Sequence, residues 1–215
     1  MTRIALIHAL AHSVDPINLE MASAWPEALR MNLLDDSLSA DLARSGGLNE
    51  AMHQRFESLA AYAERTGAQG ILFTCSAFGP CIEAVARARP HMPVLKPNEA
   101  MVTEALATGG RIGLVASFAP TLVSMPAEFP TGTALDTQLA EGALQALDVG
   151  DVARHDALVV AAARQLADRG ALVIALAQFS MARAAPAVRE HLGLPVLSTP
   201  GRAVRALNAR LARPA

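Results

Sequence analysis

The sequence has few aromatic, charged and cysteine residues. Aromatics make up 4% and charged residues 18% of the 215 residues, with 18 Lys and Arg against 20 Asp and Glu. The net charge of −2 gives no electrostatic basis for binding nucleic acid or a membrane surface, and so few rings argue against a base-stacking platform. Two cysteines are too few for a disulfide framework and, alone, for a zinc site, so we expect no metal.

Several segment types are also missing from the sequence. No apolar run approaches the roughly 20 residues of a membrane span. Residues 1–3 lead directly into a strand-like run and not into a cleavable signal. Neither G-x-G-x-x-G nor G-x-x-x-x-G-K-[ST] occurs, which disfavours a nucleotide or sugar-phosphate domain. We therefore expect a soluble protein of the reducing cytoplasm, without a nucleic-acid or membrane partner. A homo-oligomer is compatible with the sequence.

What the sequence does contain is a 52% apolar fraction, arranged as short apolar runs between helix-like segments. Runs that do not alternate with polar residues are typical of parallel strands buried on both faces. The strands expected in the first half cover residues 4–9, 31–34, 71–73 and 93–95, and the helices residues 16–25, 48–66, 80–89 and 98–107. Strands that alternate with helices predict parallel sheets with right-handed crossovers.

The pattern then repeats. Residues 111–115 resemble residues 3–7, and residues 71–95 can be laid over 173–197 without a gap, both ending on Pro-Val-Leu. We expect a long helix over 151–169 and a last helix over 202–211 that packs back on the first lobe. The prediction is an α/β fold of two similar parallel-sheet αβα lobes related by a pseudo-twofold, residues 1–97 plus 200–215 and residues 98–199. The cleft between the lobes is the expected site.

Cys75 occupies the most informative turn of the sequence. It follows the buried strand over 71–73 and precedes a helix, and in a parallel sheet this position lies at the edge where ligands bind. A helix start directs N–H groups at such a turn and favours thiolate, so we expect a lowered pKa for Cys75. Cys81 falls inside the helix and is expected in the core.

The two lobes and the turn Thr74-Cys75-Ser76 resemble the aspartate/glutamate racemase superfamily, which includes hydantoin racemases, maleate isomerases and arylmalonate decarboxylases. The resemblance implies a cofactor-independent enzyme with one cysteine from each lobe on either face of a carbon next to a carboxylate. Cys75 matches the first-lobe cysteine and Ser76 the residue that contacts substrate carboxylate. The turn from Ser117 to Thr121 resembles the small-hydroxyl turn of the second lobe.

The second-lobe cysteine of that superfamily is missing from this sequence. The family motif places it at Gln178, whereas the ungapped internal repeat pairs Cys75 with Ala177. Glutamine is not a proton base, but it donates and accepts hydrogen bonds and could orient a substrate. A two-thiol racemase therefore cannot be built from this chain.

We predict Cys75 as the catalytic thiol of an isomerase or racemase-like enzyme acting on a small carboxylate. The alternatives are a single-cysteine decarboxylase-like lyase and a non-catalytic binder of small acids. His8, at a strand end, is a candidate for the second acid–base group, and hydroxyl residues at the turns either cap helices or bind the substrate. The predicted substrate-binding residues are Thr74, Ser76, Ser117, Thr121, Gln178, Ser180 and His8.

Overall fold

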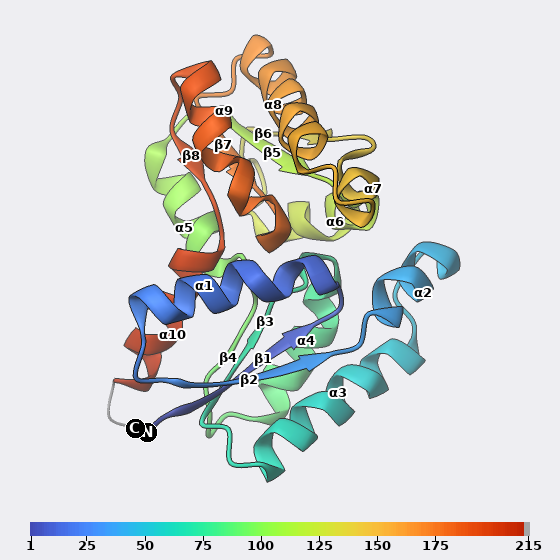
Figure 1. Cartoon of the computed structure of the whole chain (residues 1–215), viewed down its shortest axis with the longest axis vertical. Coiled ribbons are helices and arrows are strands. Elements are labelled where there is room, and N and C mark those ends of the chain that lie inside the picture. The colour runs from blue at the N-terminus through green and yellow to red at the C-terminus, as the bar shows by residue number, and fades with distance from the viewer. Residues whose placement is uncertain (213–215) are drawn as a thin grey trace. The chain divides into compact units, whose positions relative to one another are not determined.

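The structure is a computed structural model that describes residues 1–212, and its chain divides into two compact units. The first unit contains Met1–Pro97 and the segment that begins at Pro200, and the second contains Asn98–Thr199. Each unit holds one four-stranded parallel sheet, with strand orders β2-β1-β3-β4 and β6-β5-β7-β8 (Figure 1). The prediction of two similar parallel α/β lobes is therefore confirmed for the sheets and their flanking helices.

The sheet of the first unit is built around its two most apolar strands. Central β1 and β3 are almost wholly buried, as their unbroken apolar runs predict. The strands are β1 (Arg3–His8), β2 (Leu29–Leu34), β3 (Gly70–Phe73) and β4 (Val94–Leu95). Because β1 and β3 are parallel neighbours, their carboxyl ends lie side by side at one edge of the sheet.

Helices cover both faces of this sheet. Figure 1 shows α1 and α3 on opposite sides of the strands. The helices of this unit are α1 (Val14–Ala24), α2 (Ser37–Ser45), α3 (Glu50–Arg65), α4 (Gly79–Ala88) and α10 (Pro200–Leu211). Phe56 of α3 stacks on Phe73 and Phe78 with ring centroids 5.2 and 4.9 Å apart, which fastens α3 to β3 and the turn after it.

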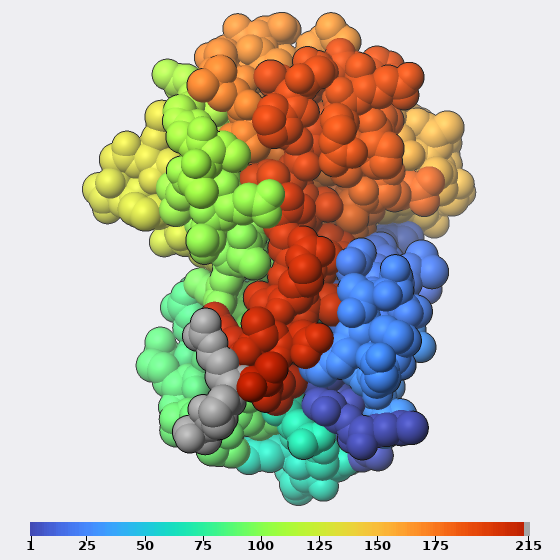
Figure 2. All heavy atoms as spheres, turned by 90° about the vertical axis from the view of Figure 1, so that its left-hand side faces the viewer, coloured from blue at the N-terminus to red at the C-terminus, as the bar shows by residue number. Residues whose placement is uncertain are grey.

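The last helix belongs to the first unit. Figure 2 shows its red atoms beside the blue atoms of α1, and α10 contacts both α1 and β3. A Cβ added to Gly70 of β3 would lie 3.2 Å from side-chain carbons of Leu207 and of Leu211. Glycine at this position therefore lets α10 approach the strand closely.

The second unit repeats this plan with different covering helices. Its strands are β5 (Ile112–Ala116), β6 (Leu135–Leu139), β7 (Val173–Leu176) and β8 (Val196–Leu197). Its helices are α5 (Glu99–Thr108), α6 (Ala119–Ser124), α7 (Ala143–Asp148), α8 (Val152–Asp168) and α9 (Ala185–Leu192). The strand β6 was not predicted because its sequence, Leu-Asp-Thr-Gln-Leu, is that of a half-exposed edge strand.

Alternate residues of the central strands in this unit serve two separate cores. Val115, Ile174 and Leu176 pack with α8 and α9. Ile112, Leu114 and Val173 point the other way and pack with α5. The period of two along each strand thus divides the apolar residues between the faces of the sheet.

Candidate active site

The sulfur of Cys75 lies where β1 and β3 end. Cys75 comes two residues after β3 and directly precedes a short 3-10 helix, η2 (Ser76–Phe78), which leads into α4. The main-chain N–H of Ala9, the first residue after β1, donates to the Cys75 sulfur at 2.8 Å. Adjacent parallel strands bring these two groups together, so the predicted position of Cys75 at the carboxyl edge of the sheet is observed.

The expected thiolate character of Cys75 is wrong. Cys75 is 8% exposed, and burial raises the pKa of its thiol to about 12 although the Ala9 N–H opposes this shift. The helix start that was expected to lower the pKa is the three-residue η2, and desolvation outweighs it. Cys81 is buried in α4 as expected, and burial together with the Glu50 carboxylate raises its pKa to about 11. At neutral pH the Cys75 thiol is therefore protonated.

Thr74 and His8 form a buried pair beside this turn. Thr74 Oγ1 lies 2.9 Å from His8 Nδ1, and His8 Nε2 lies 3.0 Å from the side-chain oxygen of Asn32. The side chain of His8 is fully buried, which lowers its pKa, and it is a neutral ring inside the unit and not a solvated one. Thr74 does not cap the following helix, because its hydroxyl contacts His8 and the Ile7 carbonyl instead.

The second unit places Gln178 where the first places Cys75. Gln178 follows β7 by two residues and precedes the 3-10 helix η4 (Phe179–Ala184). The N–H of Ser117, the first residue after β5, donates to Gln178 Oε1 at 2.6 Å, and the Ser117 hydroxyl donates to the same oxygen at 3.2 Å. This arrangement is the counterpart of the Ala9 N–H that donates to the Cys75 sulfur.

The strand registers settle which residue is equivalent to Cys75. Ile4 pairs with Gly70 in the first unit, and Ile112 pairs with Val173 in the second. Counting five residues on from Gly70 and from Val173 gives Cys75 and Gln178. The ungapped overlay of 71–95 on 173–197, which would have placed Ala177 opposite Cys75, is therefore off by one residue in the central strand.

Two buried hydroxyls of the second unit have no hydrogen-bond partner in the described chain. Thr121 in α6 is 1% exposed and Ser180 in η4 is 2% exposed, and neither side-chain oxygen is paired. A buried polar group without a partner is costly, so such groups often mark a place for a ligand or a water molecule. Ser180, like Thr74, is not used as a helix cap.

Sequence reasoning missed two groups at these turns. The main-chain N–H of Ala9 has no signal in the sequence, because any residue would supply it. Asn32 lies on an edge strand whose half-exposed pattern indicates solvent contact, and its partnership with a buried histidine depends on the register of β2 beside β1.

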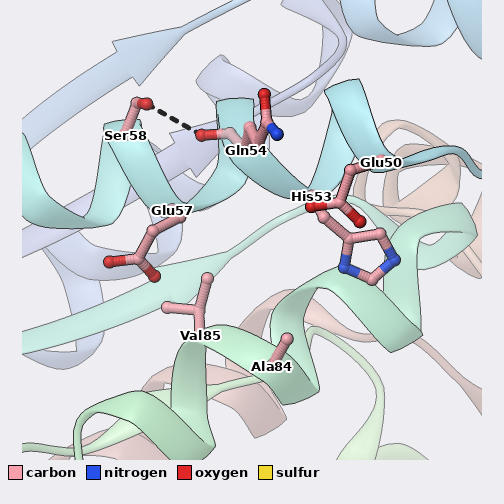
Figure 3. Close-up of a pocket in the computed structure, with 7 residues that line it drawn as sticks. All are labelled: Glu50, His53, Gln54, Glu57, Ser58, Ala84 and Val85. Carbon is pink, nitrogen blue, oxygen red and sulfur yellow. Dashed lines mark hydrogen bonds between the residues drawn. The ribbon is translucent and has the colours of Figure 1, made fainter.

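A separate hollow lies between α3 and α4. It has a volume of about 520 Å³ and is open to solvent, and Figure 3 shows His53 and Glu57 of α3 directed toward Ala84 and Val85 of α4. None of the predicted site residues lines it. Among residues 1–212, no group of three or more His, Cys, Asp or Glu side chains is placed to hold a metal ion, and no helix meets the length and apolarity that crossing a membrane requires.

Comparison with known proteins identifies the family. The sequence matches the model of the Asp/Glu/Hydantoin racemase family over residues 19–207. No curated protein sequence matches the chain.

Solved structures of racemases and of a decarboxylase are similar to this chain. Glutamate racemase from Francisella tularensis, in complex with D-glutamate, has a TM-score of 0.75 and 15% identity, over 98% of this chain and 80% of that one. Allantoin racemase from Klebsiella pneumoniae has a TM-score of 0.72 and 18% identity, over 99% and 88%. Unliganded arylmalonate decarboxylase has a TM-score of 0.60 and 16% identity, over 100% and 95%. The family model matches most of this chain, and the chain has the fold of these enzymes. The chain therefore belongs to the Asp/Glu/Hydantoin racemase family.

Proposed function

We propose that this chain is a cofactor-independent enzyme that acts at a carbon next to a carboxylate, with Cys75 as its catalytic thiol. The observation that carries the proposal is the matched pair of turns, in which a main-chain N–H holds the sulfur of Cys75 in one unit and the amide oxygen of Gln178 in the other. Family membership supports an enzyme, and its structural relatives include racemases and a decarboxylase.

We further propose that Cys75 acts as an acid on one face of the substrate carbon. Its burial keeps the thiol protonated, and Gln178 has no proton equilibrium with which to serve the other face. Reversible racemisation needs a group on each face, so one-sided chemistry fits better. In a decarboxylation the C–C bond to a carboxylate breaks, CO₂ leaves, and the electron pair forms an enolate-like carbanion that takes the Cys75 proton. Water then returns a proton to the thiolate.

The second unit supplies neutral hydrogen-bond donors for the substrate in this proposal. The Gln178 oxygen accepts hydrogen bonds from Ser117, which fixes the amide, so its Nε2 is the side-chain donor that remains for a substrate. The unpaired hydroxyls of Thr121 and Ser180 are two further donors. We propose that these groups bind a substrate carboxylate and stabilise the enolate, assisted by Ser76 of the first unit.

Decarboxylation of 2-substituted malonates in deuterated water tests the reaction class. We expect wild type to release CO₂ and to place deuterium on one face of the product carbon, giving one enantiomer. Cys75→Ala should reduce the rate by about 10²-fold or more, the usual contribution of a general acid. Cys81→Ser, which changes the other buried thiol, should keep activity. A racemic product, or full activity in Cys75→Ala, would contradict the proposal.

Exchange of the α-proton tests the missing second thiol. Wild type should show little exchange with aspartate, glutamate or a hydantoin in deuterated water. Gln178→Cys restores a thiol at the position equivalent to Cys75 and should gain measurable exchange, and combining it with Cys75→Ala should remove that exchange again. Ala177→Cys is the matched control and should gain no exchange, because the strand registers make Ala177 the equivalent of Thr74 and not of Cys75.

Two experimental outcomes would contradict the proposal and favour another function. Wild-type exchange at ordinary enzymatic rates would show that another residue serves the second face. Binding of a small carboxylate, measured by calorimetry, without turnover of any acid would favour a non-catalytic binder of racemase fold. We also propose a cytoplasmic location for this protein.

A further inference from the structure

His8 is a buried histidine whose two ring nitrogens both have defined partners. Nδ1 faces Thr74 Oγ1 at 2.9 Å, and Nε2 faces Asn32 Oδ1 at 3.0 Å. No carboxylate or cationic side chain contacts the ring within the described part of the chain. The ring therefore interacts with neutral groups alone, and its tautomer decides the direction of each hydrogen bond.

The hydrogen bonds around Asn32 fix that tautomer. The side-chain nitrogen of Asn18 donates to the carbonyl of Val14 at 2.8 Å, and a carbonyl only accepts. The same nitrogen donates to Asn32 Oδ1 at 2.9 Å, while the Asn32 nitrogen donates back to Asn18 Oδ1 at 3.2 Å. Asn32 thus presents an oxygen to His8, so Nε2 carries the ring proton and Nδ1 is an acceptor.

Thr74 has one hydroxyl proton and more than one group to receive it. Its oxygen lies 2.9 Å from His8 Nδ1 and 3.4 Å from the Ile7 carbonyl, and the sulfur of the next residue, Cys75, lies 3.7 Å from that same carbonyl oxygen. The shortest of the measured contacts is with Nδ1, an unprotonated nitrogen. A hydroxyl that donates to Nδ1 cannot donate to a thiolate at the same time.

We propose that the neutral His8 ring accepts the Thr74 hydroxyl hydrogen bond at Nδ1, directs that proton away from the sulfur, and so withholds from Cys75 a hydrogen bond that would stabilise its thiolate. His8 is then a positioning residue that acts through Thr74, and not a second acid–base group. An effect of His8 on the rate of turnover is expected only under the proposed function, in which Cys75 gives a proton to the substrate. The hydrogen-bond arrangement itself does not depend on that function.

The second unit supports a role for this network beyond folding. Strand registers place Ala116 where the first unit has His8, and Ala177 where it has Thr74. Both alanines are fully buried, so the same fold forms with apolar groups at these positions. The polar network thus accompanies the turn that carries a thiol and is missing beside Gln178.

The rate at which iodoacetamide alkylates Cys75 tests the proposal without any substrate. The background is Cys81→Ser, so that one thiol remains, and the rate at a fixed pH near 9 reports the thiolate fraction. In His8→Leu the Thr74 proton turns to the sulfur, and we expect alkylation about tenfold faster, because a hydrogen bond to a charged group changes a pKa by about one unit. A slower rate would assign His8 as a cationic partner of the thiolate, and an unchanged rate would make it structural; either result overturns the proposal.

The double variant His8→Leu with Thr74→Val separates electrostatics from access. It keeps the space opened at His8 but removes the hydroxyl, so the rate should return to the background value. If the double variant stays fast, the gain in His8→Leu came from access and the proposal fails.

Asn32→Leu provides a test that leaves the buried ring in place. Without the Asn32 oxygen the ring proton is free to move to Nδ1, which would then donate to Thr74 and release its hydroxyl toward the sulfur, so alkylation should again be faster. Thr137→Leu, at the equivalent edge-strand position of the second unit, should change nothing.

Nitrogen NMR of the wild type gives the tautomer directly. We expect a protonated Nε2 and an unprotonated Nδ1 for His8 at neutral pH, and a protonated Nδ1 would refute the proposal. If the tautomer and alkylation results hold while no acid is turned over, the proposed function fails and the positioning role stands.

Discussion

At the scale of single residues, replacing Thr121 should affect stability and substrate binding in opposite directions. Its buried hydroxyl has no partner in the described chain, and an unsatisfied group of this kind costs about 1–3 kcal/mol. Thr121→Val keeps the shape and removes the oxygen, so we expect the free energy of unfolding to rise by about 1 kcal/mol in urea denaturation. If the hydroxyl binds a substrate carboxylate, affinity for the acid should fall in the same variant.

The matched control for this change is Thr103→Val in α5. Thr103 is exposed and its hydroxyl donates to the Glu99 carbonyl at 2.9 Å, so its loss should change stability by less than about 0.5 kcal/mol and leave binding unaltered. A destabilised Thr121→Val would show that a water molecule or another group satisfies the hydroxyl in solution.

The protonation of Cys75 shows what a residue-scale reading of the sequence misses. Its place after a buried strand could be predicted, because apolar runs and turn residues are local signals. The pKa of its thiol could not be predicted, because its burial depends on a segment far away in the chain, residues 7–9 at the end of β1, which contacts the sulfur. His8 is a similar case, since a strand-end histidine is buried here by the pairing of β1 with both its neighbours.

At the scale of elements, Arg89 ties α4 to α3. It lies at the carboxyl end of α4, is 4% exposed, and donates to both carboxylate oxygens of Glu57 at 2.6 and 2.8 Å. The hydrogen bonds from Arg89 hold the pKa of Glu57 below its ordinary value. The ionised form of Glu57 is therefore favoured by folding, so its contribution to stability is present above the unfolded-state pKa and is lost as the pH falls through the folded-state pKa.

We expect Glu57→Gln to lower the free energy of unfolding at pH 7 by up to about 1 kcal/mol, since Glu57 is half exposed and solvent screens the pair. The difference from wild type should shrink as the pH falls below about 4.5. Urea denaturation at several pH values measures it. Glu27→Gln makes the same charge change at an exposed position outside any helix or strand and should show no such pH dependence; a constant difference for Glu57→Gln would exclude the ion pair as its cause.

The central strands show how far an internal repeat predicts equivalent elements. The repeat correctly placed β3 and β7 at the centres of two parallel sheets, yet its alignment was wrong by one residue there. Ile71 pairs with Val94, whereas in the second unit Ile174, and not Val173, pairs with Val196. Strand register is set by partners across the sheet, which an alignment of the chain with itself does not contain.

At the scale of the whole chain, the two units differ in how they are assembled. The second unit is one continuous segment, whereas the first needs the helix that follows the second unit in the sequence. The apolar face of this last helix is buried against the first unit. In α10 the side chains of Ala203, Val204 and Leu207 are at most 1% exposed.

This arrangement predicts different behaviour for the separated units. Residues 98–199 alone should unfold cooperatively in urea, because their sheet and both cores lie within the segment. Residues 1–97 alone should not, because the loss of α10 exposes the face of β3 around Gly70. Full burial of Val204 and Leu207 contributes roughly 3–6 kcal/mol together, a large share of the 5–15 kcal/mol that stabilises a domain.

A permuted fragment tests whether α10 is the missing part. Residues 200–212 joined by a flexible linker to the start of residues 1–97 should recover cooperative unfolding, whereas the same fragment with Leu207→Asp should not, because a charge would be buried in the interface with β3. Circular dichroism and urea titration of the four fragments measure the outcome. If residues 1–97 already fold as stably as the permuted fragment, α10 is peripheral to the first unit. If residues 98–199 remain unfolded alone, the second unit depends on the first, and the two halves of this duplicated fold are not independent domains.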